Sequence, residues 1–436
     1  MSVESSGKPD AWKLARPVWG WGRGAILRPT PLIYGLLVVE GLLWLSERYR
    51  WFGFGDHSDW ATLFINLTVV GAVIFLMPLC FIASLLFRWR FQFSIRSLLV
   101  LVIAVAIPCS WLAAKMQQAG RQRQAIALVQ SLGGVVHEER YVPDLLQTLH
   151  GLLPDVFFAE IHFVEFDSKS NAVSDAHLDE LVKLLPHIDI LLLSSTNVTN
   201  AGMETLNGLN ELNYLSLSNT KVTDVGLERL SGLKQLHMLF VDNTEITDAG
   251  LERLKGHKLR MLRLSGTQVT DIGLGHLQGQ KLTSLALCDT KITDAGLNLL
   301  KGQDELQSLL LNGTRITDAG LENLKGLKSL RKLQLSRTTV TDKGMKHLES
   351  LTTLIDLDLS GTQVTDRGLG HLQGMNELQQ LNLGDTKVTD SGLERLAVLK
   401  LDVFQLVGKL SLVGTKTTKA GVKKLQQAWP NCTIER

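Results

Sequence analysis

The sequence predicts an α/β solenoid of parallel strands and short helices, preceded by an all-α transmembrane region. Between Thr196 and Val422 the chain repeats ten times a phrase close to Thr-x-Val/Ile-Thr-Asp-x-Gly-Leu, at intervals of 23 or 24 residues and a last step of 29. A unit this short cannot bury its own leucines, so neighbouring units must stack. Before the repeats, residues 31–114 contain three apolar runs.

Each unit combines a strand pattern with a helix pattern. In one unit, Leu212, Leu215 and Leu217 predict a short strand with inward leucines, because the residues between them alternate. The following Gly226-Leu227-x-x-Leu230 predicts a short helix with an inward apolar stripe. Parallel strands are therefore expected on the concave wall of a right-handed solenoid, and helices on the convex wall.

Two polar positions recur in the units. The threonine that opens the phrase is placed at a turn, where its hydroxyl can bond backbone groups of the next coil and so form a structural ladder. The aspartate four residues later is expected to cap the helix, because a carboxylate there accepts backbone N–H groups and favours the helix dipole. This position favours capping over a calcium or acid array. The ladder comprises Thr220, Thr244, Thr267, Thr290, Thr314, Thr338, Thr362 and Thr386, and the helix caps are Asp224, Asp248, Asp271, Asp294, Asp318, Asp342, Asp366 and Asp390.

The leucine spacing resembles that of leucine-rich repeat proteins, whose pattern is Leu-x-x-Leu-x-Leu-x-x-Asn/Cys-x-Leu. This chain has threonine where that family usually has Asn or Cys. The Ile-Thr-Asp-x-Gly-Leu phrase is most similar to the cysteine-containing subtype, found in ubiquitin-ligase substrate receptors and in many bacterial proteins. The resemblance implies a binding scaffold and no particular activity.

Three apolar runs, about 31–47, 61–87 and 97–114, are expected to form two or three membrane-spanning helices. The first run contains Glu40, whose charge would cost about 2.5 to 3.5 kcal/mol at the bilayer centre, so two spans remain the alternative. Buried core helices are a further alternative, disfavoured by three such runs flanked by Trp and Arg.

The charges beside these runs predict the orientation. Eight basic residues lie in the N-terminal segment and the second connection, against five on the other side. By the positive-inside rule, residues 1–30 are cytoplasmic and the repeats lie outside the cytoplasmic membrane. No cleavable signal peptide is expected, because the first apolar run begins only at Pro31.

The segment from Arg88 to Val136 resembles the anchor of membrane leucine-rich repeat proteins of planctomycete bacteria, through its Arg88-Trp-Arg-Phe-Gln-Phe start and the Leu132-Gly-Gly-Val-Val motif. The resemblance implies an envelope family without an inherited mechanism. The expected organisation is then a linker helix at 115–132, an N-terminal cap at 133–170 and about 11 repeats at 171–436.

Composition and motifs argue against catalysis and nucleic-acid binding. Lys and Arg number 45 against 43 Asp and Glu, so no basic excess favours nucleic acid. The four cysteines, Cys80, Cys109, Cys288 and Cys432, suggest neither a disulfide nor a zinc site. His276 and His371 occupy equal positions of distant units and cannot share a metal. We expect no catalytic residues, no metal and no cofactor.

The outward positions of the strands supply the candidate partner-binding residues. Aromatic, Met and Arg side chains gather on three consecutive units, and these residue types are enriched at protein interfaces. The alternative is an internal seam covered by the cap or linker of the same chain. Lys332 beside Asp356 and Asp358 is interpreted as a solvated charge group. The expected concave patch consists of Tyr214, Met238, Phe240, Met261 and Arg263.

The last unit allows two strand registers. Both Leu401-x-x-Phe404-x-Leu406 and Val407-x-x-Leu410-x-Leu412 fit the strand pattern, and only one can join the wall. The second keeps the ladder threonine at Thr415 and is the prediction. The step of 29 residues should then contain a five-residue loop.

Together these observations predict a membrane-anchored, non-enzymatic module that mediates protein–protein interaction at the cell envelope. Its partners would be the membrane lipid bilayer and an unknown protein. Two alternatives remain: a ubiquitin-ligase substrate receptor, by repeat resemblance only, and a structural envelope protein that forms homo-oligomers. The first would need a helical adaptor motif upstream, where the apolar runs stand instead.

Overall fold

The computed structural model describes residues 117–140, 159–166, 172–398 and 408–436, with the isolated positions 106, 110 and 114. The expected membrane-spanning runs at 31–47 and 61–87, and nearly all of 97–114, lie outside the described residues. Within the part that is described, no helix combines the length and apolarity that crossing a bilayer requires.

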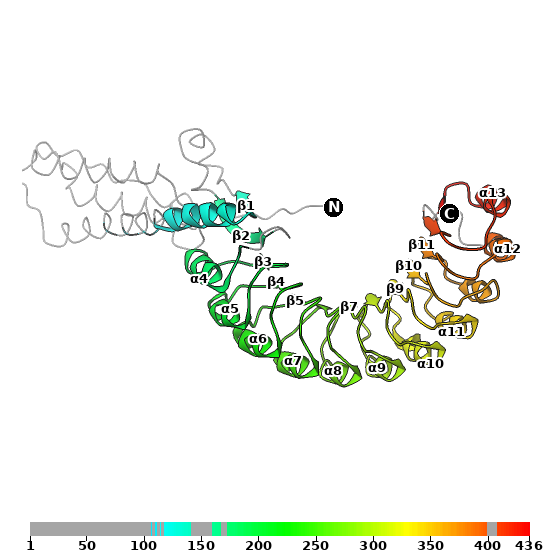
Figure 1. The fold of residues 1–436 in the computed structure, drawn as a ribbon, viewed down its shortest axis with the longest axis horizontal. Coiled ribbons are helices and arrows are strands. Elements are labelled where there is room, and N and C mark those ends of the chain that lie inside the picture. Colours follow the sequence, from blue (N-terminus) through cyan, green and yellow to red (C-terminus); the bar gives the residue numbers. More distant parts are fainter. Residues whose placement is uncertain are drawn as a thin grey trace, which may run out of the picture. The chain divides into compact units, whose positions relative to one another are not determined.

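One sheet runs through the described units. Its thirteen strands follow the order of the chain, β1 to β13, with β1 and β2 antiparallel and every later pair parallel. Figure 1 shows the strands along the inner side of a curved solenoid and the helices along its outer side. The strands are β1 Gly134–Arg140, β2 Ala159–Phe166, β3 Ile190–Leu192, β4 Tyr214–Ser216, β5 Met238–Phe240, β6 Met261–Arg263, β7 Ser284–Ala286, β8 Ser308–Leu310, β9 Lys332–Gln334, β10 Asp356–Asp358, β11 Gln380–Asn382, β12 Lys409–Ser411 and β13 Thr433–Glu435.

Short helices return the chain from one strand to the next. Most units have an α-helical turn that begins at the phrase aspartate, and several continue into a 3-10 turn that ends at a glycine. The α-helices are α4 Asp175–Leu184, α5 Asn200–Thr205, α6 Asp224–Arg229, α7 Asp248–Arg253, α8 Asp271–Gly275, α9 Asp294–Asn298, α10 Asp318–Leu321, α11 Asp342–Leu348, α12 Asp390–Val398 and α13 Lys419–Ala428. The 3-10 helices are η4 Leu206–Gly208, η5 Leu230–Gly232, η6 Leu254–Gly256, η7 Glu322–Gly326 and η8 Gly368–Leu372.

Leucines fill the space between the two walls. Leu309 is fully buried and stands in register with Leu285 and Leu333 of the neighbouring strands. Its neighbours in β8, Ser308 and Leu310, point to the other face and are half-buried. The alternation inferred from the sequence therefore holds in these strands. The solenoid core is one continuous stack, as the short repeat requires.

The ladder threonines are buried, but their hydrogen bonds differ from the prediction. Thr220 Oγ1 donates to the carbonyl oxygen of Leu217, 2.6 Å away in its own coil. The same bond to the residue three positions earlier occurs at all eight predicted threonines. The expected bond to the next coil is wrong, because the turn brings the carbonyl of the same strand within reach of the hydroxyl.

The phrase aspartates supply the inter-coil link instead. Asp224 accepts from the backbone N–H of Thr247 at 2.8 Å and from its hydroxyl at 2.6 Å, 23 residues along the chain. The N-cap of the next helix, α7, is Thr247 itself, whose Oγ1 accepts from the N–H of Ala249. The capping role assigned to the aspartates is therefore corrected. The aspartate follows the cap by one position, so its carboxylate is left to bond the adjacent coil.

This link recurs along the stack. Each of the eight predicted aspartates bonds the threonine of the following unit, with N–O distances of 2.7 to 2.8 Å and O–O distances of 2.5 to 2.7 Å. At Asp390 the two bonds to Thr418 hold the pKa of the carboxyl below its ordinary value. We call this series the aspartate–threonine ladder.

The phrase glycine makes room for the ladder. A Cβ built on Gly250 would overlap Oδ1 of Asp224, and the corresponding glycines of the later units meet the preceding aspartate in the same way. The repeated Thr-Asp-x-Gly sequence therefore supplies all three partners of one contact between neighbouring coils. The threonine donates, the aspartate of the preceding coil accepts, and the glycine leaves space for the carboxylate.

Two units lack the phrase aspartate, and the aspartate–threonine ladder differs there. Asn200 replaces the aspartate of its unit, accepts from the Thr223 N–H at 2.9 Å, and donates its Nδ2 to the Thr223 hydroxyl. Thr223 then makes no side-chain cap bond to its own helix. In the last unit Lys419 stands at the aspartate position and begins α13.

The last strand uses the predicted register. In β12, Leu410 pairs with Leu381 of β11, and Leu410 and Leu412 are buried. The Thr415 hydroxyl bonds the carbonyl of Leu412, as its counterparts do. The loop expected from the step of 29 residues falls in 399–407, outside the described residues.

The residues before the repeats add to the first coil. Residues 117–131 are helical, and Ala125 and Val129 of this helix join the solenoid core. β1 and β2 form an antiparallel pair, with an irregularity between His137 and Glu138, and β2 pairs with β3. These elements lie in the ranges assigned to the linker helix and the N-terminal cap.

Candidate interaction surface

The strand face brings the five predicted residues together. Tyr214, Met238 and Met261 are aligned across β4, β5 and β6, and Phe240 is aligned with Arg263. The four apolar or aromatic side chains are half-buried, whereas Arg263 is exposed. We call these five residues the concave patch. They lie together because each of the two outward positions of a strand is aligned with the same position of the next strand.

Ring contacts tie three of these side chains together. Tyr214 meets Phe240 edge-to-face, with centroids 4.8 Å apart and an interplanar angle of 61°. The guanidinium carbon of Arg263 lies 5.0 Å from the centroid of the Phe240 ring, within the range of a cation–π contact. Phe240 is therefore held between a phenol and a cation on two neighbouring strands.

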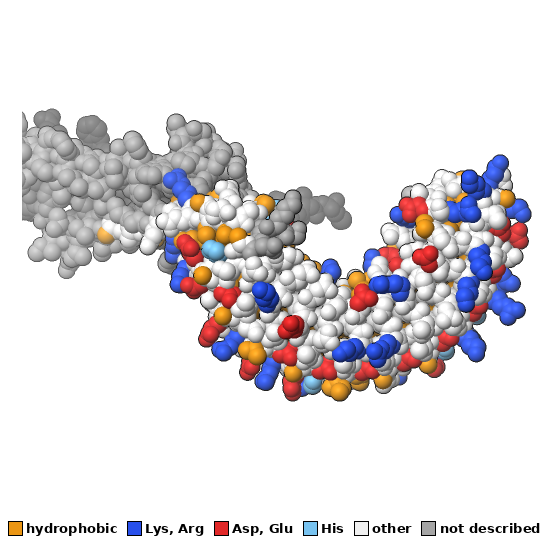
Figure 2. Space-filling model, viewed as in Figure 1, with side chains coloured by type: hydrophobic (Ala, Val, Ile, Leu, Met, Phe, Trp, Pro, Cys, Tyr) orange, Lys and Arg blue, Asp and Glu red, His pale blue; other side chains and the backbone are white. Residues whose placement is uncertain are grey.

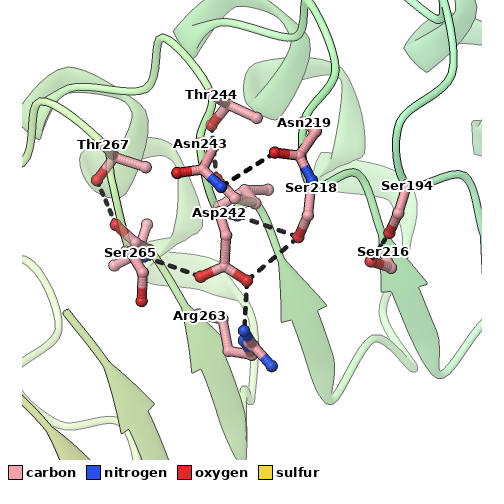
Figure 3. Close-up of polar contacts among 12 residues, drawn as sticks. Ser194, Ser216, Ser218, Asn219, Asp242, Asn243, Thr244, Arg263, Ser265 and Thr267 are labelled. Atoms are coloured by element: carbon pink, nitrogen blue, oxygen red, sulfur yellow. Dashed lines mark hydrogen bonds and ion pairs between the residues drawn. The ribbon is translucent and has the colours of Figure 1, made fainter. Parts of the chain in front are cut away.

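The buried carboxylate of Asp242 forms an ion pair with Arg263. Asp242 Oδ2 lies 2.8 Å from Nε of Arg263, and its side chain is only 8% exposed. It also accepts from the Ser265 backbone N–H at 2.9 Å and from the Ser218 hydroxyl at 3.2 Å. Figure 3 shows this carboxylate in contact with residues of the coils on either side of its own. Its charge is compensated by these donors, as burial requires.

Burial also affects the phenol. Partial desolvation raises the pKa of Tyr214, with Asp242 and Glu165 acting in the same direction and Arg263 opposing them. The hydroxyl therefore stays protonated at neutral pH and remains a hydrogen-bond donor. The patch thus presents apolar surface, one phenolic donor and one cation.

The apolar strip extends beyond the predicted residues. Ile190 of β3 is aligned with Tyr214 and, on its other side, with Phe163 of β2; both are half-buried. Leu192 lies on the same face, and Phe163 stacks on His137 with centroids 4.2 Å apart. Sequence reasoning missed Ile190 and Leu192 because Ile190-Leu-Leu-Leu193 is a continuous apolar run without visible alternation. The spacing of Ile188, Leu191 and Leu193 was the signal that could have placed them.

Two outward positions near the patch carry small side chains that are buried. These are Ser216 in β4 and Ala286 in β7. Their small side chains are flanked by larger outward neighbours on adjacent strands, and the Ser216 hydroxyl bonds that of Ser194 at 2.7 Å. The surface that a partner could contact therefore consists of the larger outward side chains.

Sequence-family models agree with this coil geometry. Models described as leucine rich repeat match residues 186–246, 326–348, 350–372 and 375–397. These stretches of the chain are leucine-rich repeats. No curated protein matches it significantly.

Several solved structures resemble part of this chain. An internalin from Listeria monocytogenes is 20% identical, with a TM-score of 0.46 over 60% of this chain and 76% of that one. Internalin C2 from the same organism is 23% identical, with a TM-score of 0.33 over 60% and 86%. The plant peptide hormone receptor RGFR1, in complex with RGF2, is 14% identical, with a TM-score of 0.38 over 59% and 48%.

From β9 onward the outward strand residues are polar. Lys332 Nζ lies 2.6 Å from Asp356 Oδ2, an ion pair at the surface, and Lys409 pairs with Glu435 at 2.8 Å. Such pairs contribute about 0 to 1 kcal/mol to stability. On the outer face, Figure 2 shows acidic and basic side chains interspersed. The apolar strip that contains the concave patch is thus followed, from β9 onward, by a polar strand face.

Leucine-rich repeat solenoids are typically binding modules, and the candidate reactive residues here are separated or engaged. His371 pairs with Glu349, whereas His276 is the residue that follows α8 in a different unit. The described cysteines, Cys288 and Cys432, are free, and burial raises the pKa of both thiols, so neither is activated. Among the described residues, no group of three or more His, Cys, Asp or Glu could hold a metal ion.

Proposed function

We propose that this protein is a membrane-anchored, non-enzymatic leucine-rich repeat module that binds a protein partner at the cell envelope through the concave patch. The observation that carries the proposal is the contiguous block of Tyr214, Phe240 and Arg263, linked by ring contacts on neighbouring strands. Aromatic and arginine anchors on a rigid surface are the usual energetic centres of protein interfaces. Concave strand walls are the surfaces that solenoids use for binding.

Support for the membrane part comes from the sequence. The apolar runs at 31–47, 61–87 and 97–114 have the composition of spanning helices, and the basic residues beside them favour repeats on the extracytoplasmic side. A multi-pass anchor would keep the solenoid at the surface of the cytoplasmic membrane. The partner would then be a protein of the envelope.

The proposal is tested by cross-linking and capture from native membranes with the full-length protein. Phe240→Ala should weaken partner capture by about 1 to 4 kcal/mol, because an aromatic anchor is lost from the interface. Its melting temperature should change little, since Phe240 lies outside the leucine core. Lys332→Ala, an outward residue of β9 in a surface ion pair, is the matched control and should have little effect on capture.

Two outcomes would contradict the proposal. If Phe240→Ala lowers the melting temperature strongly and capture falls only in proportion to unfolding, the patch is an internal seam. If the captured species is only a second copy of this chain, the protein is a self-associating structural component.

A further inference from the structure

Arg263 is the cation of the concave patch, and two contacts fix its position. Its side chain is 46% exposed, its Nε is 2.8 Å from Asp242 Oδ2, and its guanidinium lies over the Phe240 ring. A planar guanidinium held in this way has lost much of its rotational freedom before a partner arrives.

Asp242 serves as the support for Arg263. The carboxylate is 8% exposed and accepts from Ser218 and Ser265 as well as from the guanidinium. It engages Arg263 through Nε, and Figure 3 shows the two contacts from the serines on its other sides. Because Asp242 is surrounded by donors of its own coil stack, it is not positioned to bind a partner.

The terminal nitrogens distinguish Arg263 from the other cations near the strand wall. Lys332 and Lys409 use Nζ to pair with Asp356 and Glu435, and Arg337 uses Nη2 to pair with Asp289. The ion pair of Arg263 uses Nε and its side chain is 46% exposed, and among the described residues no hydrogen bond or ion pair engages its two Nη groups. The paired Nη groups match the two oxygens of a carboxylate.

Apolar side chains surround this position. Phe240 lies under the guanidinium, and Tyr214 and Met261 lie on the adjoining strands, all half-buried. A ligand that placed only a carboxylate here would leave this apolar surface in water. A ligand that placed only an apolar side chain would leave the Nη groups of Arg263 desolvated without an acceptor.

We propose that the concave patch recognises a protein segment in which an apolar side chain lies next to the side-chain carboxylate of Asp or Glu, with that carboxylate bound by the Nη groups of Arg263. The inference rests on the proposed function and specifies its ligand. Asp242 is then a positioning residue, and Phe240 supplies the apolar contact. Lysine cannot replace Arg263 fully, because an ammonium group does not form the paired contact.

The test is selection of peptides from a random-sequence display library on the full-length protein purified in detergent. Selected peptides should be enriched in an aromatic or aliphatic residue adjacent to Asp or Glu. Arg263→Glu should abolish that acidic preference and favour Lys or Arg. For one selected peptide, Arg263→Lys should weaken binding about tenfold, the scale of one charged hydrogen bond. Lys332→Ala should leave the peptide's affinity unchanged.

The outcomes separate this inference from the proposed function. Peptides whose binding is lost in Phe240→Ala but which show no acidic preference would overturn the assignment to Arg263 and leave the interaction surface intact. The same conclusion follows if neutralising the peptide's Asp or Glu to its amide has no effect on affinity. Selection of no peptide, or of peptides insensitive to Phe240→Ala, would count against both.

Discussion

At the scale of single residues, the same side-chain type has different roles at different positions of the coil. Asp224 links two coils through a threonine, whereas Asp242 is buried beneath the strand face and supports Arg263. Thr220 bonds its own coil, and Thr247 caps a helix while donating to the preceding one. Residue type alone therefore does not assign a role; the position within the coil does.

The strand register predicts the response of two neighbouring leucines. Leu309→Ala should lower the free energy of unfolding by about 2 to 5 kcal/mol. The change removes buried apolar atoms, whose transfer out of water stabilises the fold, and leaves a cavity between coils. Leu310→Ala, on the opposite face of β8, should cost less than about 1 kcal/mol. Urea unfolding followed by circular dichroism measures both. Equal losses would contradict the observed register.

The phrase glycine offers a second test, in which packing opposes helix propensity. Gly250 lies inside α7, where alanine would ordinarily be favourable, yet the added Cβ would overlap the Asp224 carboxylate. Gly250→Ala should therefore destabilise the solenoid by about 1 to 3 kcal/mol.

Gly256 is the matched control for that change. It ends η6, has no atom near the position of an added Cβ, and lies outside the positive-φ glycines. Gly256→Ala should leave the free energy of unfolding within about 0.5 kcal/mol of the parent. A loss at Gly256 as large as that at Gly250 would mean that the carboxylate is not the cause.

At the scale of elements, the aspartate–threonine ladder joins each helix start to the next. It complements the backbone bonds of the sheet on the opposite wall, so each coil is fastened to its neighbour on both walls. Asp175 makes the same two bonds to Thr199 at the start of the stack, Asn200 replaces a carboxylate by an amide in the next unit, and Lys419 stands at the aspartate position of the last unit. Coil stacking is thus maintained by polar contacts that the leucine core does not provide.

The ladder predicts a pH dependence at its last link. The bonds from Thr418 lower the pKa of Asp390 in the folded state, so the link stabilises the protein above the ordinary carboxyl pKa and is lost as pH falls through the folded value. Asp390→Asn should therefore be less stable than the parent near neutral pH. The difference should shrink in acid, where the parent carboxyl is protonated. Urea midpoints measured across this range provide the check, and a difference independent of pH would refute the link.

At the scale of the whole molecule, one surface is distinguished from the rest. The apolar strip begins at Phe163 and Ile190 and continues through the concave patch to Met261, whereas later strands present Lys332, Asp356 and other polar groups. Such a contiguous strip on a rigid wall is typical of a contact surface. In the proposed membrane-anchored arrangement, access to a partner would depend on the side of the membrane on which the solenoid lies.

The proposed orientation has a direct test. Ser231 is exposed in η5, so Ser231→Cys should react with a membrane-impermeant thiol reagent in intact cells if the repeats are extracytoplasmic. The parent chain is the control for its own cysteines, of which Cys288 is half-buried and Cys432 is buried. Labelling of Ser231→Cys only after lysis would place the repeats in the cytoplasm.

The periodicity of the sequence determined the stacked coils, the inward leucines, the grouping of Tyr214, Phe240 and Arg263, and the register of the last strand. These features depend on spacing along the chain, which is printed in the sequence. The tertiary structure alone decided which atoms meet across coils. The hydroxyl of Thr220 bonds a carbonyl of its own coil, whereas the carboxylate of Asp224 bonds Thr247 of the next coil. Which residues about one repeat apart come within hydrogen-bonding distance depends on the rise and curvature of the stack. The tertiary structure also placed Phe163 and Ile190 beside the patch, since only strand pairing reveals that an irregular first unit continues the same face.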